Sequence, residues 1–180
     1  MTRLQEGNIQ AFEEIYERYC RLLYVFLYRI LHSRERAEDC LQCVFMSLWE
    51  KSRSYKYPMP FKPWIYKIAY NRALNELKKI KIRNIFSETF LQHVNDSGCE
   101  NTAIAKMESE QNVEQVKKAV DSLPDKQRMM IILREYEEVE FEDISRISGY
   151  GVGSIKYQIG KAYESLERKL KYMRGDVHHE

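Results

Sequence analysis

The chain has 180 residues, 44% hydrophobic and 31% charged, which indicates a folded protein of one domain or two small ones and excludes a disordered chain. The sequence shows neither a signal peptide nor an apolar run of membrane-spanning length, so we expect a cytoplasmic protein without membrane insertion. The formal net charge of +2 conceals a separation of sign, because residues 1–86 are basic, the segment after them is acidic, and residues 156–174 are basic again.

Two amphipathic helices are predicted in the first fifty residues. Asn8 can cap a helix that starts near Ile9, and apolar residues then recur at three- and four-residue spacing as far as Ile30. Ser33 is placed to cap a second helix, whose apolar stripe ends at Trp49. The opposite face of the second helix is short, polar and acidic, which predicts a surface that contacts water or a basic partner.

Two cysteines, Cys40 and Cys43, form a C-x-x-C pair on the second helix, a pattern found in zinc and redox sites. The sequence has no second pair of this kind, and Cys20 and His32 do not complete a known ligand spacing. Both cysteines of the pair also fall on the apolar stripe, which favours reduced core thiols. We therefore expect neither a metal nor another cofactor, while a thiol or zinc sensor stays open as an alternative.

A proline-rich break precedes the third helix, whose apolar side runs from Trp64 to Leu77. Residues 51–83 are rich in basic and aromatic side chains. Positive charge attracts a polyanion and exposed rings can stack on the bases of an open strand, although a basic run can also be a solvated helix face. The residues that this pattern leaves outside the core are Tyr55, Tyr57, Tyr66, Tyr70, Arg72, Asn75, Lys78 and Lys79.

The helical pattern is interrupted once along the chain. Three helices with wide apolar stripes can bury one common core, so we expect residues 1–86 to fold as one helical domain. Residues 87–112 are acidic and contain a cluster of turn residues, which is typical of a flexible linker. The helical period returns over residues 113–175. The predicted fold class is all-α, with two small helical domains joined by a flexible linker.

The second domain has the spacing of a helix-turn-helix. A short helix is predicted from about Phe141 to Ser148, Gly149 can take the left-handed conformation that ends it, and Ser154 is placed to start the last helix. The exposed side of that helix can contact phosphates and base edges. The residues on this side are Ser154, Lys156, Tyr157, Gln158 and Lys161. A plain helical hairpin with a solvated basic face would give the same pattern.

Both halves resemble one protein family. The first half contains FEEIYERYCRLLYVFLYRIL, AEDCLQCVFMSLWEK and FKPWIYKIAYNRALNELKK, and the second contains LPDKQRMMIILREYEEVEFEDISRISG and VGSIKYQIGKAYESLERKL. These segments resemble the bacterial RNA polymerase sigma factors of the extracytoplasmic-function (ECF) group, which keep only the domains called region 2 and region 4. The resemblance covers nearly the whole chain apart from the linker and the last few residues.

The resemblance implies a division of labour between the domains. Asp39, Gln42 and Phe45 would dock on the clamp helices of the polymerase β′ subunit. The third helix and the loop before it would recognise and open the −10 element of promoter DNA, while the helix-turn-helix would read the −35 element and contact the β flap. Members of the group are commonly held inactive by an anti-sigma factor, which implies such a partner. Chemistry stays with core RNA polymerase, so we expect no enzyme activity.

The chain departs from the family pattern at five positions. Cys43 stands where the family usually has an acidic residue, Asn75 where it has Asp, Lys78 and Gln158 where it has Arg, and Gly160 where it has a bulkier residue. We expect these changes to affect one polymerase contact and the choice of promoter. The main alternative function is a helix-turn-helix regulator that binds operators as a dimer without polymerase, which would leave residues 8–84 without a clear task.

Overall fold

Side-chain caps set the first helix boundaries in the computed structural model, which describes residues 1–56, 58–88 and 115–175. The Asn8 side chain accepts a hydrogen bond from the Ala11 N–H at 2.8 Å and caps α2 (Ile9–Leu31). Ser33 Oγ accepts one from the Arg36 N–H at 3.4 Å at the start of α3 (Arg34–Lys51). Both predicted helix starts are confirmed. A short additional helix, α1 (Thr2–Gln5), precedes them.

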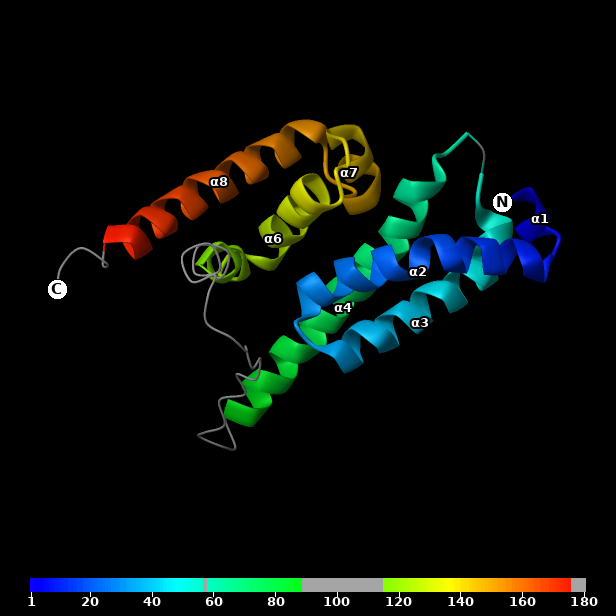
Figure 1. The fold of residues 1–180 in the computed structure, drawn as a ribbon, viewed down its shortest axis with the longest axis horizontal. Helices are drawn as coiled ribbons and strands as arrows, with labels where there is room; N and C mark the ends of the chain where they lie inside the picture. The colour runs from blue at the N-terminus through cyan, green and yellow to red at the C-terminus, as the bar shows by residue number, and fades with distance from the viewer. Residues whose placement is uncertain (57, 89–114, 176–180) are drawn as a thin grey trace, which may run out of the picture.

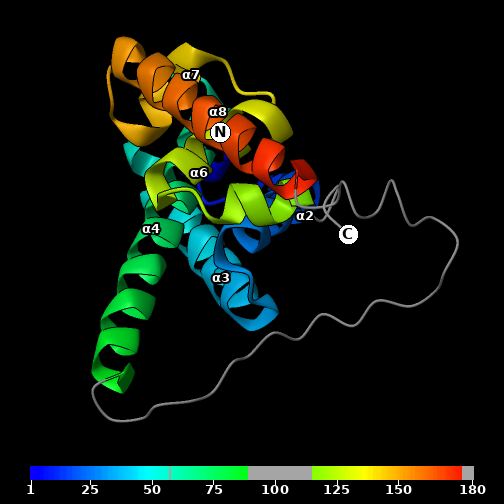
Figure 2. The same cartoon turned by 90° about the vertical axis from the view of Figure 1, so that its left-hand side faces the viewer.

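The third long helix extends further than the sequence predicts. A 3-10 turn, η1 (Ser52–Ser54), follows α3, and α4 (Phe61–Glu88) begins after the proline-rich loop. The C-terminal turns of α4 project away from the other helices (Figures 1 and 2). Residues 87 and 88 of the expected linker are therefore helical, and residues 89–112 lie outside the described part of the chain.

The second half forms the predicted helix-turn-helix. After a helical segment at residues 115–121, its elements are α6 (Asp125–Ile131), the π-helical η2 (Ile132–Tyr136), α7 (Phe141–Ser148) and α8 (Val152–Gly175). Gly149 ends α7 with a φ of 80°, as predicted. The start of α8 lies two residues before the predicted Ser154, because the Ile155 N–H already donates to the Gly151 carbonyl at 3.0 Å.

The hydrophobic core lies between α2, α3 and α4. Its buried side chains include Leu23, Phe26, Leu27 and Ile30 of α2, Val44 and Leu48 of α3, and Ile65, Ala69 and Ala73 of α4. Every regular element in the described residues is helical, which confirms the all-α prediction. None of the helices described here combines the length and apolarity that crossing a bilayer requires.

The two helical domains pack against each other. α7 packs directly on α4, and the C-terminal end of α2 also contacts the second domain (Figures 1 and 2). The buried residues of both domains form one continuous apolar cluster, in which Met129 and Ile144 of the second domain join Phe26 and Tyr66 of the first. One side of α4 is therefore covered by the second domain, which decides the exposure of its aromatic residues.

Candidate nucleic-acid interface

The outer face of α3 carries two of the three residues expected to bind polymerase. Asp39 and Gln42 are exposed, as predicted. Phe45 is only 4% exposed, and its ring packs 4.7 Å from that of Tyr16 and 6.0 Å from that of Phe12. α2 therefore covers the Phe45 ring, and the contact of Phe45 with polymerase stays a prediction.

Two large apolar side chains missed by the sequence analysis share this face. Met46 is 62% and Trp49 is 42% exposed, although Trp49 was expected in the core. Residues 39, 42, 46 and 49 follow the helical spacing that places them on one side of α3. This spacing is visible in the sequence and could have assigned Met46 and Trp49 to the same face as Asp39 and Gln42. We call this set, Asp39, Gln42, Met46 and Trp49, the docking face.

The loop before α4 holds Tyr55 in a fixed position. The Tyr55 hydroxyl donates to the Met59 carbonyl, and its ring lies edge-on to Trp64 with centroids 5.2 Å apart. Trp64 is partly buried and packs against the core, in agreement with its predicted role. Tyr57, which was also predicted to face DNA, lies outside the described residues.

Tyr66 and Tyr70 are buried, so the expectation that both rings are free to meet a ligand is wrong for this arrangement. The Tyr66 hydroxyl donates to Glu137 Oε2 of the second domain at 2.6 Å, and its ring packs edge-on against Phe26. Burial, reinforced by the Glu137 carboxylate, raises the pKa of Tyr66 above its ordinary range. Burial also raises the pKa of Tyr70 to about 12. Their contact with promoter DNA stays a prediction.

The polar residues expected on α4 remain at its surface. Arg72, Asn75, Lys78 and Lys79 are all exposed. The Arg72 guanidinium donates to Ser47 Oγ of α3 at 2.9 Å, and Lys79 forms an ion pair with Glu76 at 3.2 Å. This side of α4 thus offers positive charge that the second domain does not bury.

A buried carboxylate joins the two domains. Glu137 follows η2 and accepts hydrogen bonds from Tyr66 and, at 3.2 Å, from Arg29 of α2. Its backbone carbonyl also accepts a bond from Lys62 Nζ at 3.0 Å. The Glu137 side chain is 6% exposed and that of Arg29 is 37% exposed, so water screens only one end of this ion pair.

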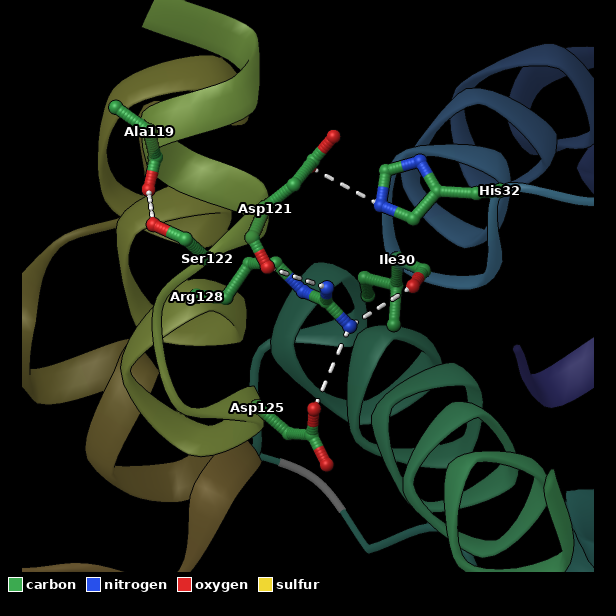
Figure 3. Close-up of polar contacts among 7 residues, drawn as sticks. All are labelled: Ile30, His32, Ala119, Asp121, Ser122, Asp125 and Arg128. Carbon is green, nitrogen blue, oxygen red and sulfur yellow. Dashed lines mark hydrogen bonds and ion pairs between the residues drawn. The ribbon is translucent and has the colours of Figure 1, made fainter. Parts of the chain in front are cut away.

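A buried arginine makes the second attachment between the domains (Figure 3). Arg128 of α6 donates to the Ile30 carbonyl near the end of α2 at 3.1 Å and to the Asp121 carbonyl at 3.3 Å. Its guanidinium also lies 3.5 Å from Asp125 Oδ1. The Ile30 carbonyl lies in the last turn of α2, where carbonyls have no partner within the helix. Arg128 of the second domain therefore caps a helix of the first domain.

His32 lies beside this attachment, with its Nε2 3.1 Å from Asp121 Oδ1 (Figure 3). Burial lowers the pKa of His32, and this effect outweighs the opposing attraction of the Asp121 carboxylate. The imidazole is therefore more easily deprotonated than in the unfolded chain. Stability from this site is present above the unfolded pKa and declines as the pH falls through it towards the folded pKa.

The last helix presents most of the predicted −35 residues to solvent. Ser154, Lys156, Tyr157 and Lys161 are exposed on α8, and Tyr157 is 62% exposed. Gln158 is half-buried and accepts a hydrogen bond from Gln127 at 2.9 Å. The predicted surface therefore exists, with Gln158 partly engaged inside the domain.

The structure brings the two predicted DNA surfaces together in one place. Lys78 of α4 lines a cavity of about 470 Å³ together with Ser154 and Gln158 of α8. Lys81 at the same cavity forms an ion pair with Asp125 of α6. In this arrangement side chains predicted to meet the −10 element and side chains predicted to meet the −35 element therefore line one cavity.

The cysteine pair does not form a metal site in the structure. Cys40 is buried and Cys43 half-buried, and the described residues contain no group of three metal-ligating side chains. Burial, assisted by nearby Glu76, raises the pKa of the Cys40 thiol to about 11. The thiolate, which is the reactive form, is thus disfavoured at this position.

We expect Cys40 to resist alkylation in the native protein, because at pH 8 only about one thiol in a thousand is ionised at this pKa. The measurement is mass spectrometry after treatment with iodoacetamide at pH 8, with protein denatured in guanidinium as the control that reacts fully. Rapid native alkylation of Cys40 would contradict this and support the thiol-sensor alternative.

Family comparisons agree with this architecture in both halves. Residues 15–82 match the model of sigma-70 region 2, and residues 113–166 match that of sigma-70 region 4. The chain is 26% identical over 180 residues to the ECF RNA polymerase sigma factor SigW of Bacillus subtilis, with 95% of each chain covered. It is 27% identical over 183 residues to the ECF sigma-E factor of Escherichia coli, covering 95% of this chain and 92% of that one.

Solved structures show the same fold. The sigma factor RpoE of Bartonella quintana, in complex with the anti-sigma factor NepR, superimposes with a TM-score of 0.70 at 23% identity over 90% of this chain and 98% of that one. CnrH, in complex with the cytosolic domain of CnrY, superimposes with a TM-score of 0.68 at 17% identity, over 95% of this chain and 94% of that one. Regions 2 and 4 are matched in order, and the ECF relatives align over nearly their whole length. The chain therefore belongs to the ECF sigma factors, subunits that bind core RNA polymerase and direct promoter-specific initiation.

Proposed function

We propose that the docking face is the surface by which this sigma factor binds core RNA polymerase. The observation that carries the proposal is the exposure of Met46 and Trp49 beside the polar Asp39 and Gln42. Methionine and tryptophan are enriched in protein interfaces, where they act as anchors surrounded by polar groups. The family resemblance supports the proposal, because it implies a contact of this same helix with the β′ clamp helices.

We propose that the loop before α4 and the exposed side of α4 bind the opened −10 strand. Tyr55, Arg72, Asn75, Lys78 and Lys79 provide an aromatic ring, an amide and positive charge along one continuous stretch. Tyr66 and Tyr70 are buried, and the Tyr66 hydroxyl is bonded to Glu137 of the second domain, so on this proposal they join the surface only when the second domain leaves α4. Promoter opening on this proposal therefore requires separation of the two domains.

We propose that α8 reads the −35 element as a duplex. Its exposed lysines and Tyr157 suit phosphate and groove contacts, and the helix is presented by the turn at Gly149 as in other helix-turn-helix proteins. In the family this domain also contacts the β flap. Gln158 would have to release Gln127 before its amide could bind a base edge.

We further propose that an anti-sigma factor binds this chain and that the protein has no enzyme activity. Two proteins with the same fold were solved as complexes with NepR and with CnrY, of which NepR is named an anti-sigma factor. Sigma factors are initiation factors, and the reaction belongs to the polymerase. A cytoplasmic location follows on this proposal, since the polymerase and the promoter are there.

The decisive experiment is in-vitro transcription with purified core RNA polymerase over a promoter library. We expect the protein to bind core polymerase and to produce transcripts from a small set of promoters that core polymerase alone does not use. Absence of both binding and promoter-dependent transcripts would overturn the proposal. Tight, specific duplex binding by the isolated protein in that case would favour the operator-binding alternative.

Removing the charge of Lys156 is expected to weaken binding of −35 duplex DNA similarly for different sequences. A lysine that contacts phosphate contributes through counterion release, so Lys156→Ala should reduce the slope of log affinity against log salt by about 1. The measurement is a salt titration of duplex binding by fluorescence anisotropy. Lys171→Ala is the matched control, since Lys171 is exposed on the same helix but outside the predicted set. Equal slopes for wild type and Lys156→Ala would contradict this.

A further inference from the structure

The short helix α1 is built into the first domain although it precedes the region 2 match, which begins at residue 15. Leu4 is 1% exposed and belongs to the core cluster. Gly7 turns the chain from α1 into α2 with a φ of 81°, a conformation that favours glycine. Arg3 forms an ion pair with Glu14 of α2 at 3.2 Å. These contacts fix α1 against α2 and so give the side chain of Gln5 a defined position.

The Gln5 amide joins α1 to the turn that leads into the promoter loop. Its Nε2 donates to the Ser52 carbonyl at 3.0 Å and to the Tyr55 carbonyl at 2.9 Å. A single NH₂ group has two hydrogens, so both are used. The two carbonyls lie at the start of η1 and just after its end, and the Tyr55 N–H also donates to the Ser52 carbonyl at 3.1 Å. Gln5 therefore fixes the turn from outside, across about fifty residues of sequence.

The position of this turn determines where Tyr55 lies. The Tyr55 ring is packed edge-on against Trp64 at 5.2 Å and Phe61 at 6.3 Å, and its hydroxyl holds the Met59 carbonyl further along the loop. A displacement of the Tyr55 backbone would thus also displace the loop and the first turn of α4, which the Tyr55 side chain contacts. These are the elements proposed above to receive the opened strand.

We propose that Gln5 is a positioning residue for −10 recognition, which keeps the strand-binding loop in its binding conformation before DNA arrives. The inference rests on the proposed role of the loop. A binding site whose loop is already ordered loses less conformational freedom on binding and discriminates better between ligands. Both hydrogen bonds of the Gln5 amide go to backbone carbonyls, so on this proposal Gln5 acts through the loop and not through contact with DNA.

The test compares Gln5→Met, which keeps the length but has no donor, with Gln5→Lys, whose ammonium group can donate to both carbonyls. Gln10→Met is the matched control, because Gln10 is exposed on α2. Each full-length protein is combined with core RNA polymerase on a promoter from the transcription library and on versions of it with single −10 substitutions. The measurements are open-complex formation, affinity for core polymerase, and the thermal midpoint of the free protein.

We expect Gln5→Met to reduce open-complex formation about tenfold on the original promoter. We also expect it to lower the −10 ratio, defined as open-complex formation on the original promoter divided by that on a promoter with a −10 substitution. Affinity for core polymerase should stay within about twofold, and Gln5→Lys should recover most of the ratio. An unchanged −10 ratio in Gln5→Met, a similar loss in Gln10→Met, or a parallel loss of core affinity would overturn the inference. Failure of the wild-type protein to form open complexes at any promoter would instead overturn the proposed function.

Discussion

Replacing Met46 and Trp49 together by alanine is expected to weaken binding of core RNA polymerase about 30-fold, a loss of about 2 kcal/mol. Both side chains are large and apolar, and both are exposed on the outer face of α3, Met46 more fully than Trp49. Their burial in an interface would remove apolar surface from water, and truncation would forfeit that gain. The measurement is titration of fluorescently labelled protein with core polymerase, followed by transcription from a selected promoter.

The control for this prediction is Ile82→Ala, which truncates an apolar side chain that is 56% exposed on α4. Trp49 also contacts Phe12 edge-on at 5.7 Å, so the thermal midpoint of each variant must be recorded. Met46→Ala alone separates the two effects, because substitutions at exposed sites usually change stability by less than about 0.5 kcal/mol. Wild-type affinity in the double variant would show that polymerase binds another surface.

Helix boundaries were predictable because the interactions that set them are local. Asn8 and Ser33 bond to backbone groups three residues away, and Gly149 takes the positive φ that a following turn requires. The period of apolar residues likewise predicted which helices share a core. These signals are contained within a few consecutive residues, so the order of the helices and the helix-turn-helix could be derived without coordinates.

The exposure of individual site residues depended on contacts that are distant in sequence. The hydroxyl of the buried Tyr66 bonds to Glu137, which lies 71 residues further along the chain. Gln5 bonds to carbonyls 47 and 50 residues away. Trp49 lies at the edge of an apolar stripe, where the period alone does not distinguish a buried from an exposed ring. The packing of the second domain on α4 therefore could not be predicted from helical patterns within each domain.

Glu137→Ala is expected to destabilise the packing of the second domain on α4 by about 2–3 kcal/mol. The substitution leaves the buried Tyr66 hydroxyl without its acceptor and removes the partner of Arg29. Arg29 is more than one-third exposed, so water replaces part of its lost ion pair and the Tyr66 hydroxyl dominates the cost. The measurements are urea unfolding by circular dichroism and hydrogen exchange of residues 132–139 and 61–70.

Glu137→Gln separates charge from hydrogen bonding at the same position. The amide oxygen can still accept from Tyr66, so we expect a loss of less than about 1 kcal/mol from the weakened contact with the exposed end of Arg29. Glu140→Ala is the control, since its pair with Arg134 at 3.1 Å lies at the surface and its carboxylate is 71% exposed. Equal losses for the alanine and glutamine variants would show that charge, and not the Tyr66 hydrogen bond, holds the domains together.

The same Glu137→Ala variant is expected to bind single-stranded −10 DNA about 30- to 150-fold more tightly than the wild-type free protein, the factor to which a loss of about 2–3 kcal/mol corresponds. A strand that binds only the separated form must overcome the free energy that holds the domains together, and the substitution lowers that free energy. The Tyr70 hydroxyl favours separation as well, because it is buried without a hydrogen-bond partner among the described residues and would be hydrated once uncovered. Fluorescence anisotropy with a labelled −10 strand measures the gain. Loss of stability without any gain in strand binding would show that the covered side of α4 does not contact the promoter strand.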